Sequence, residues 1–303
     1  MSEFGGQQGV RSVDPLYWSR HEGARWEEIG QIPGIRSGSQ GLFGIDQYNA
    51  GLYVISSAGD AQGVLTWLRY DLETQEWTTP QTVPGLVSRG RPSPAAYHGL
   101  LYLICQENVV LQARQLKWCT FDSETNTWSR VRTVPNAKAY NGPHTTALNK
   151  LLYVTFVDED WNLSWLAYDS KTEKWTEPQA VPQVTSPSWW NVAAAGGKLF
   201  AVYAALEAPL RWVSYDPEAG EWSPPQEIAG TENAWTVALS PDKGLLRAVY
   251  QTAPFDGDWW WVSYDIENQK WGDADLIPDV KWSGRVAIAP FGGPLYAVYK
   301  KRD

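Results

Sequence analysis

Apolar residues in this chain form short runs that are separated by Gly, Pro and Asn, the residues that favour turns. One run recurs six times, as a leucine followed mostly by aromatic, small and β-branched residues: LYVIS (52–56), LYLIC (101–105), LYVTF (152–156), LFAVY (199–203), LRAVY (246–250) and LYAVY (295–299). Runs of this length and composition, bounded by turn residues, predict β-strands rather than helices.

A second pattern combines a Trp-x-x-Tyr or Trp-x-x-Phe strand with a tryptophan ten residues after the first. It occurs as LTWLRYDLETQEW (65–77), LKWCTFDSETNTW (116–128), LSWLAYDSKTEKW (163–175), LRWVSYDPEAGEW (210–222) and WWWVSYDIENQKW (259–271). A shorter copy, LYWSRHEGARW, covers residues 16–26, so the closing tryptophans fall at positions 26, 77, 128, 175, 222 and 271. Self-similarity at a fixed period of this size indicates a repeat architecture.

The spacing within each copy predicts which faces are buried. Side chains alternate between the two faces of a sheet, so Trp67 and Tyr70 lie on opposite faces. Both faces are therefore expected to be covered, as in a sheet stacked between two others. Proline cannot donate a ladder hydrogen bond, so Pro80, Pro178 and Pro224 indicate that the segment after the closing tryptophan is an outer edge strand.

The remaining segments complete a four-stranded unit. After the outer strand comes a turn of the form Ile/Val-Pro-Gly or a variant of it, at residues 32–34, 83–85, 134–136, 181–183, 228–230 and 277–279. A strand of small residues follows and leads into the LYxxx strand. We name these strands A (small residues), B (LYxxx), C (Trp-x-x-Tyr) and D (outer). Four short strands per repeat are typical of a propeller blade.

These observations predict an all-β, six-bladed β-propeller with four-stranded antiparallel blades, forming one domain over residues 1–303. The expected blades are approximately 35–84, 86–135, 136–182, 183–229, 230–278, and 279–303 together with 14–33. The chain begins with strands C and D and ends after strands A and B. The last blade is therefore expected to be closed by strands from both termini, which leaves no open sheet edge.

Composition and charge narrow the function classes. The net charge of -9 argues against nucleic acid, because a phosphate backbone requires a dense Lys/Arg surface. The apolar runs are too short for membrane insertion, and the first residues lack the features of a signal peptide. We expect a cytoplasmic protein, with export by a non-classical route left open, and a monomer or small homo-oligomer. Cys105 and Cys119 lie on adjacent strands and could be bridged or free.

Two resemblances follow from these segments. SYDPEAGEWSPPQEIAG (214–230) resembles the YDPxTxxW segment of kelch repeats, although the double glycine of kelch units is absent. LYWSRHEGARWEEIGQIPG (16–34) resembles the tandem YWS-x-x-DG-x-x-W repeats of bacterial and fungal six-bladed propeller lectins. The second resemblance covers nearly the whole chain and implies the propeller fold and carbohydrate binding.

Residues that depart from the repeat are the candidates for function. Strands A and B are antiparallel, so the D-to-A and B-to-C connections are expected at one face of the ring. The aromatic candidates there are Tyr140, Trp161, Trp189, Trp190, Trp235, Trp259 and Trp282, and the polar candidates are Arg89, Arg91, His144, Asn191 and Arg285. Aromatic rings stack on the C–H faces of sugars, while Arg and Asn bond to paired hydroxyls. Any single tryptophan could instead plug the channel or fill a gap between blades.

Catalytic and metal-binding patterns are weak. The three histidines, His21, His98 and His144, fall in different repeats, and no spacing typical of a metal site occurs. We therefore expect no catalytic residue, no metal and no cofactor. The leading interpretation is a multivalent lectin that binds glycans or glycoconjugates in up to six related pockets. A kelch-like protein-interaction platform is the alternative, and a propeller hydrolase acting on glycans comes third.

Overall fold

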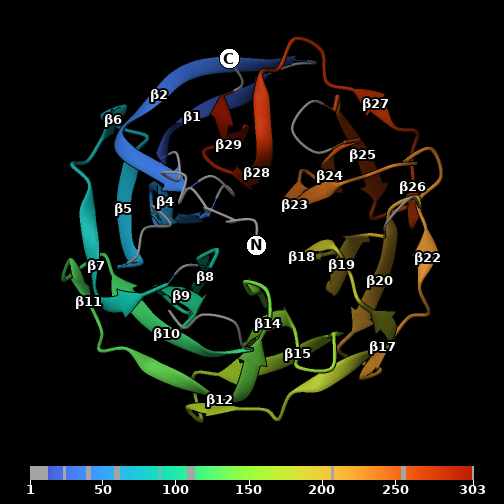
Figure 1. The fold of residues 1–303 in the computed structure, drawn as a ribbon, viewed down its shortest axis with the longest axis horizontal. Helices are drawn as coiled ribbons and strands as arrows, with labels where there is room; N and C mark the ends of the chain where they lie inside the picture. Colours follow the sequence, from blue (N-terminus) through green and yellow to red (C-terminus); the bar gives the residue numbers. More distant parts are fainter. Residues whose placement is uncertain are drawn as a thin grey trace, which may run out of the picture.

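A computed structural model of the chain describes residues 13–22, 25–38, 42–57, 62–88, 90–107, 113–205, 208–253 and 257–301. Six antiparallel sheets stand around a central axis and form a closed ring (Figure 1). The predicted all-β, six-bladed propeller is confirmed. No helix within the described ranges is long and apolar enough to cross a membrane.

The first two strands of each blade lie nearest the axis. The innermost strands are β3 (Phe43–Tyr48), β8 (Ser93–Tyr97), β13 (His144–Leu148), β18 (Trp189–Ala195), β23 (Thr236–Asp242) and β28 (Trp282–Pro290). Each pairs with the next strand out, which is β4 (Gly51–Ser57), β9 (Leu100–Gln106), β14 (Leu151–Val157), β19 (Lys198–Ala204), β24 (Leu245–Gln251) or β29 (Leu295–Lys301). Adjacent innermost strands contact one another all the way around the axis.

The third and fourth positions complete each blade. The third strands are β5 (Val64–Asp71), β10 (Arg114–Asp122), β15 (Asn162–Asp169), β20 (Arg211–Asp216), β25 (Trp259–Asp265) and β1 (Val13–Glu22). In five blades the outer strand is split into β6 (Glu76–Trp77) and β7 (Gln81–Val87), β11 (Thr127–Trp128) and β12 (Arg132–Ala139), β16 (Lys174–Trp175) and β17 (Gln179–Thr185), β21 (Glu221–Trp222) and β22 (Gln226–Glu227), or β26 (Lys270–Trp271) and β27 (Asp275–Leu276). Pro80, Pro178 and Pro224 lie in the breaks, where no ladder hydrogen bond is required.

The sixth blade combines both ends of the chain. Its strand order is β2-β1-β29-β28, and the outer strand β2 (Arg25–Gly38) runs without a break. Strand β1 pairs with β29 through Trp18 and Val298, among other residues. The predicted closure by strands from both termini is therefore confirmed, and it joins the first and last described strands directly.

The turn after each outer strand has the same backbone conformation in all six copies. The residue after the proline, or after Ala229 in the fourth blade, has a positive φ: Gly34, Gly85, Asn136, Gln183, Gly230 and Asp279. The Ile or Val two residues earlier is buried in every copy, as for Ile32 and Ile228. Glycine and asparagine tolerate the left-handed region best, so four of the six copies carry a residue suited to this turn.

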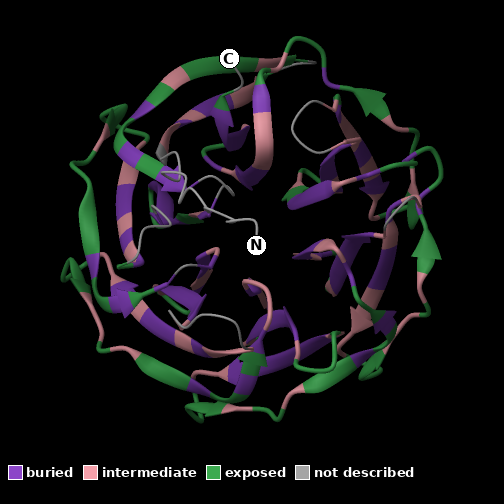
Figure 2. Cartoon of the chain, in the orientation of Figure 1, coloured by how far each residue is buried: buried purple, intermediate pink, exposed green. Residues whose placement is uncertain are grey.

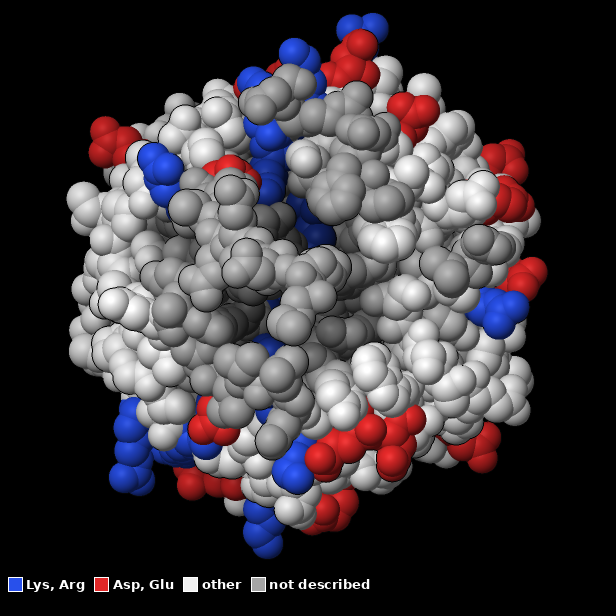
Figure 3. Space-filling model, viewed as in Figure 1, with Lys and Arg blue, Asp and Glu red and all other residues white. Residues whose placement is uncertain are grey.

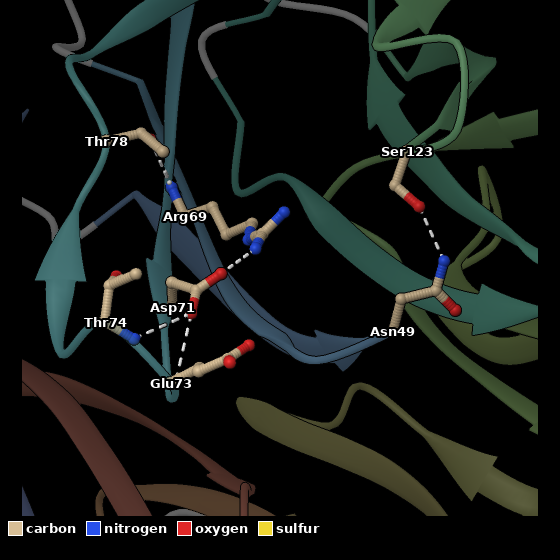
Figure 4. Close-up of polar contacts among 7 residues, drawn as sticks. All are labelled: Asn49, Arg69, Asp71, Glu73, Thr74, Thr78 and Ser123. Atoms are coloured by element: carbon tan, nitrogen blue, oxygen red, sulfur yellow. Dashed lines mark hydrogen bonds and ion pairs between the residues drawn. The ribbon is translucent and has the colours of Figure 1, made fainter.

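The aspartate at the end of strand C organises the turn between strands C and D. In the first blade Asp71 accepts hydrogen bonds from the backbone N–H of Glu73 and Thr74, at 3.0 and 3.1 Å, and also contacts Arg69 (Figure 4). The backbone N–H of Arg69 donates to the hydroxyl of Thr78, next to the closing tryptophan. Hydrogen bonds from backbone N–H groups lower the pKa of the equivalent Asp169 as well. The YD pattern that recurs in the repeat therefore stabilises a local turn.

The same aromatic contact joins the blades at five of the six junctions. The strand C tryptophan of one blade packs edge-on against the closing tryptophan of the next, with ring centroids 4.9–6.1 Å apart and interplanar angles of 68–74°. The pairs are Trp18–Trp77, Trp67–Trp128, Trp118–Trp175, Trp165–Trp222 and Trp212–Trp271. Edge-to-face pairs contribute about 0.5–1.5 kcal/mol beyond burial of area. Buried residues accordingly concentrate inside the ring while the outer strands are exposed (Figure 2).

The sixth junction uses a histidine in place of tyrosine. His21 occupies the position that Tyr70 has in the first blade, and its ring lies 4.8 Å from Trp261 and 5.2 Å from Trp26. Burial lowers the pKa of His21, with the charge of Arg247 as the next cause. This histidine therefore belongs to the packing between blades rather than to a candidate site.

The two cysteines, whose state the sequence left open, are free thiols. Cys105 and Cys119 are both buried inside one blade. Burial raises the pKa of Cys119 to about 12 and that of Cys105 further above its ordinary value. Thiols that stay protonated at neutral pH are poor nucleophiles, so neither is a candidate for chemistry.

Candidate functional site

Two adjoining cavities lie on the axis of the ring. The innermost strands surround a cavity of about 340 Å³, and a second cavity of about 170 Å³ lies where these strands begin. Arg91 and His144 line both cavities. On the face shown in Figure 3, Lys and Arg atoms are visible inside the central hollow, whereas Asp and Glu atoms lie mostly toward the rim.

The second cavity is encircled by one structurally equivalent residue from each blade. In each blade, the fourth residue of the LYxxx strand pairs with a residue of the innermost strand, as Ile104 pairs with Ser93 in the second blade. The equivalent residue stands two positions before that partner, so in the second blade it is Arg91. We call this set the mouth ring: Leu42, Arg91, Gly142, Trp189, Thr236 and Arg285. No two neighbouring blades contribute the same residue type. The mouth of the channel is therefore asymmetric, although the ring that carries it is regular.

The two arginines of the mouth ring are held in fixed positions. The Nε of Arg91 donates a hydrogen bond to the carbonyl oxygen of Phe43, at 3.1 Å. The guanidinium carbon of Arg285 lies 3.9 Å from the centroid of the Trp189 ring. Residue 284 has a positive φ of 71° within a β-bulge between Ser283 and Val286, which turns the Arg285 segment out of the regular ladder.

Both arginines carry a charge that no other described residue neutralises. Burial lowers the pKa of Arg91 to about 10. Burial also lowers the pKa of Arg285 to about 9, with the positive charge of Arg91 as the second cause. Neither forms an ion pair with another described residue. At neutral pH both stay protonated, so the mouth carries two positive charges that no described residue pairs with.

A neutral histidine lies directly inside the mouth ring. His144 is the first residue of β13 and is only 8% exposed. Burial and the charges of Arg91 and Arg285 hold its pKa well below the ordinary value, although a hydrogen bond with Asn191 opposes this. The neutral imidazole offers one donor and one acceptor, so it can bond to a ligand without adding charge.

Two aromatic pairs border the same cavity. Tyr140 lines it and stacks on Trp161, with ring centroids 4.6 Å apart and an interplanar angle of 11°. Trp189, on the ring itself, lies 6.3 Å from Trp235. Tyr140 belongs to a D-to-A connection and Trp161 to a B-to-C connection, so their contact confirms that both sets of connections meet at one face.

Trp161 is held in an unusual conformation at the surface. It is 51% exposed and has a φ of 63°, in the left-handed region that bulky residues seldom adopt. The carboxylate of Asp158 fixes the turn by accepting hydrogen bonds from the backbone N–H of Asp160 and of Asn162, each at 2.9 Å. A large apolar ring that a constrained turn holds in solvent is a feature typical of binding sites.

The structure separates the predicted site residues into three groups. Those that line the cavity at the mouth are Arg91, Tyr140, His144, Trp189, Trp190 and Arg285, while Asn191, Trp161 and Trp235 adjoin them. Trp190 is 3% exposed, and its indole N–H donates to Thr155, so it forms part of the core beneath the cavity. Arg89 lies outside the described residues.

Trp259 and Trp282 fill a gap between blades, which is the alternative that the sequence left open for any single tryptophan. They are 2% and 1% exposed, and the indole N–H of Trp259 donates to the carbonyl oxygen of Trp282 at 3.1 Å. Both pack in the apolar cluster between the fifth and sixth blades. These two side chains differ from the repeat because they fill a gap between blades. We therefore leave them out of the candidate site.

One cavity residue was missed from the sequence although a signal for it exists. Asp46 lines the axial cavity at a position where the other blades have Ala95, Thr146, Ala193, Ser240 and Ala289. Its carboxylate accepts a hydrogen bond from the backbone N–H of Ala96 at 2.6 Å, and burial raises its pKa to about 6. Alignment of strand A across the six copies would have shown a single carboxylate among small residues.

The described lining of the two cavities has no pair of carboxylates. Asp46 is the single acidic residue among them. Glycoside cleavage by the common mechanisms requires two carboxyl groups on either side of the bond. The described residues also contain no cluster of His, Cys, Asp and Glu suited to a metal ion. The geometry of these residues is better suited to binding than to acid–base chemistry.

No protein-family model and no curated protein matches this sequence. The chain is similar in fold to solved propellers of low sequence identity. The structure of YjhT matches at 12% identity over 86% of this chain and 93% of that one, with a TM-score of 0.63. Aleuria aurantia lectin, a fungal six-bladed propeller that recognises fucose, matches at 12% identity over 86% of each chain, also with a TM-score of 0.63.

Hydrazine synthase from Kuenenia stuttgartiensis is also similar, at 16% identity over 88% of this chain and 76% of that one, with a TM-score of 0.56. Similarity at these identities establishes a shared fold. It does not transfer a ligand or a reaction, because propellers with a lectin name and with an enzyme name both match.

Proposed function

We propose that this protein is a carbohydrate-binding propeller, a lectin in the broad sense, that binds a glycan at the mouth of its central channel without cleaving it. The observation that carries the proposal is the stacked pair of Tyr140 and Trp161, which places a half-exposed indole beside a cavity lined by planar polar groups. Stacking on an aromatic face combined with bonds to paired hydroxyls is the chemistry of sugar recognition.

The polar partners are suited to hydroxyl groups. Asn191 and neutral His144 supply donors and acceptors, and the two arginines supply fixed N–H groups. The similarity in fold to a fungal lectin that recognises fucose supports the proposal. Because the mouth ring is asymmetric, we propose a single glycan-binding site on the axis. Additional pockets between blades, and hence multivalent binding, stay a prediction.

A glycan array followed by calorimetry tests the proposal. The wild type should bind a defined subset of glycans, and Trp161→Ala should lower the affinity for them at least tenfold with an unchanged melting temperature. Leu276→Ala is the matched control, because Leu276 is 49% exposed on the outer strand β27, far along the blade from the axis. It should bind as the wild type does.

Two results would count against the proposal. Absence of binding to fucosylated, galactosylated, methylated, GlcNAc-bearing and acidic glycans would contradict the proposal. Capture of a defined protein partner that survives excess free sugar, and is lost in Trp161→Ala, would favour the kelch-like interaction platform at the same surface.

A further inference from the structure

The strongest unexplained feature of the molecule is the positive charge inside the mouth ring. Arg91 and Arg285 come from the second and sixth blades, which flank the blade of Leu42. All ten ion pairs among the described residues involve other side chains. Both side chains are partly buried, and charges that are largely removed from water are normally paired in proteins, because the loss of hydration is costly. A counter-charge is therefore missing from the described part of the site.

The geometry leaves N–H groups of both guanidinium groups available to a ligand. Arg91 uses its Nε toward the protein, through the hydrogen bond to Phe43, which leaves its terminal nitrogens. Arg285 lies over the Trp189 ring, and none of its N–H groups donates a hydrogen bond to another described residue. Planar guanidinium groups present forked donors that match the two oxygens of an oxyanion.

The surroundings of the two arginines select for a compact anion. Gly142 occupies the mouth ring beside Arg91, and a Cβ there would lie 3.0–3.1 Å from Arg91 atoms, so the glycine leaves room that another residue would fill. His144 adds a neutral donor just inside the ring. The cavity of about 170 Å³ is smaller than a typical pocket for a whole ligand, which suits a charged group inserted from a larger molecule.

We infer that Arg91 and Arg285 bind the carboxylate of an acidic sugar, which enters the mouth ring as the counter-ion that the described residues do not provide. The inference rests on the proposed function as far as the ligand is a saccharide. That the ligand carries an oxyanion is inferred from the two arginines and the cavity alone. A free inorganic anion would satisfy the same arginines, so the test must separate the two sources.

Calorimetry at constant ionic strength with four probes makes this separation: sodium D-glucuronate, D-glucose, sodium acetate and sodium phosphate. Glucuronate should bind, and glucose, which lacks the carboxylate, should bind at least tenfold more weakly. Arg91→Met and Arg285→Met should each lower glucuronate affinity at least tenfold. Arg132→Met is the matched control, because Arg132 also lies over a tryptophan, Trp118, but on the outer strand β12. It should leave the affinity unchanged.

A thermal melt keeps the inference testable if a variant is perturbed. Glucuronate should raise the melting temperature of the wild type and of Arg132→Met, and should have no effect on Arg285→Met. Arg285→Lys, which keeps the charge and loses the fork, should recover only part of the glucuronate affinity.

Each pattern of results decides the question. Equal binding of glucuronate and glucose, unaffected by Arg285→Met, would overturn the inference and leave the proposed function standing. Acetate or phosphate binding as tightly as glucuronate, with the same arginine dependence, would uphold the oxyanion site and remove its saccharide part. Absence of binding by glucuronate, acetate and phosphate would overturn the inference outright.

Discussion

The junctions between blades and the mouth of the channel are built on opposite principles. At five junctions the same pair of tryptophans meets in nearly the same geometry, and at the sixth His21 takes the place of a tyrosine. At the mouth, equivalent positions hold residues as different as Gly142, Trp189 and Arg285. The copies agree where they hold the ring together and differ where they face a shared cavity. Agreement among repeats thus marks structure, and disagreement on the axis marks the candidate site.

The largest expected effect comes from breaking a junction. Trp175→Ala removes a ring that contacts Trp118 at 5.8 Å and Tyr168 at 4.9 Å. Because Trp175 is half-buried, we expect a loss of about 3 kcal/mol in the free energy of unfolding, at the low end for large-to-small aromatic substitutions. Urea unfolding measures it. Trp161→Ala, at the candidate site, should change this free energy by less than about 0.5 kcal/mol.

A smaller effect of opposite sign is expected at Asp46, inside the axial cavity. Its folded pKa of about 6 exceeds the ordinary value of 3.8, so the folded state holds the proton more tightly than the unfolded state does. The carboxyl group therefore costs stability once it ionises, and this cost develops as pH rises from about 4 to 6. Asp46→Asn should raise the stability at pH 7 by about 1 kcal/mol, after allowance for partial exposure.

The matched control for Asp46→Asn is Asp169→Asn in the turn between strands C and D. Hydrogen bonds from the backbone lower the pKa of Asp169, so its contribution is present above the ordinary pKa and is lost as pH falls below it. Asp169→Asn should therefore lower stability at pH 7. If both substitutions shift the melting curve in the same direction, the contrast between axis and periphery is not electrostatic.

Arg285→Met without ligand should change the stability by about as much as Asp46→Asn does. Removing an unpaired charge while keeping an apolar stem on Trp189 should raise the free energy of unfolding by about 1 kcal/mol. Differential scanning calorimetry compares it with Arg132→Met, which should be neutral or slightly destabilising. A clear loss of stability in Arg285→Met would show that the protein itself satisfies this arginine.

The architecture could be predicted well from the sequence, because the residues that define the repeat are those that pack within a blade and against its neighbours. The spacing of Trp67 and Tyr70, the prolines of the outer strand and the out-of-phase termini led to the blade count and to the closure. The site was predicted less completely, because departure from the repeat has two causes. Trp259 and Trp282 depart from it to fill a gap between blades, whereas Trp161 departs from it to stand in solvent.

The mouth ring was not identified as a set, although its members are aligned in the sequence. Each of the six residues, including Arg91, Trp189 and Arg285, stands ten residues before the leucine of the next LYxxx run. The spacing shows that these positions are equivalent, and the register of each innermost strand shows that they surround one axis. Asp46 could have been found by comparing strand A across all six copies.

The most direct test of the account is a crystal structure of the protein soaked with the tightest-binding glycan from the array. The account predicts electron density for the sugar at the mouth of the channel, against Trp161 or Tyr140, with an acidic group within hydrogen-bonding distance of Arg91 and Arg285. Density for the sugar confined to the junctions between blades, with the mouth ring unliganded, would contradict it.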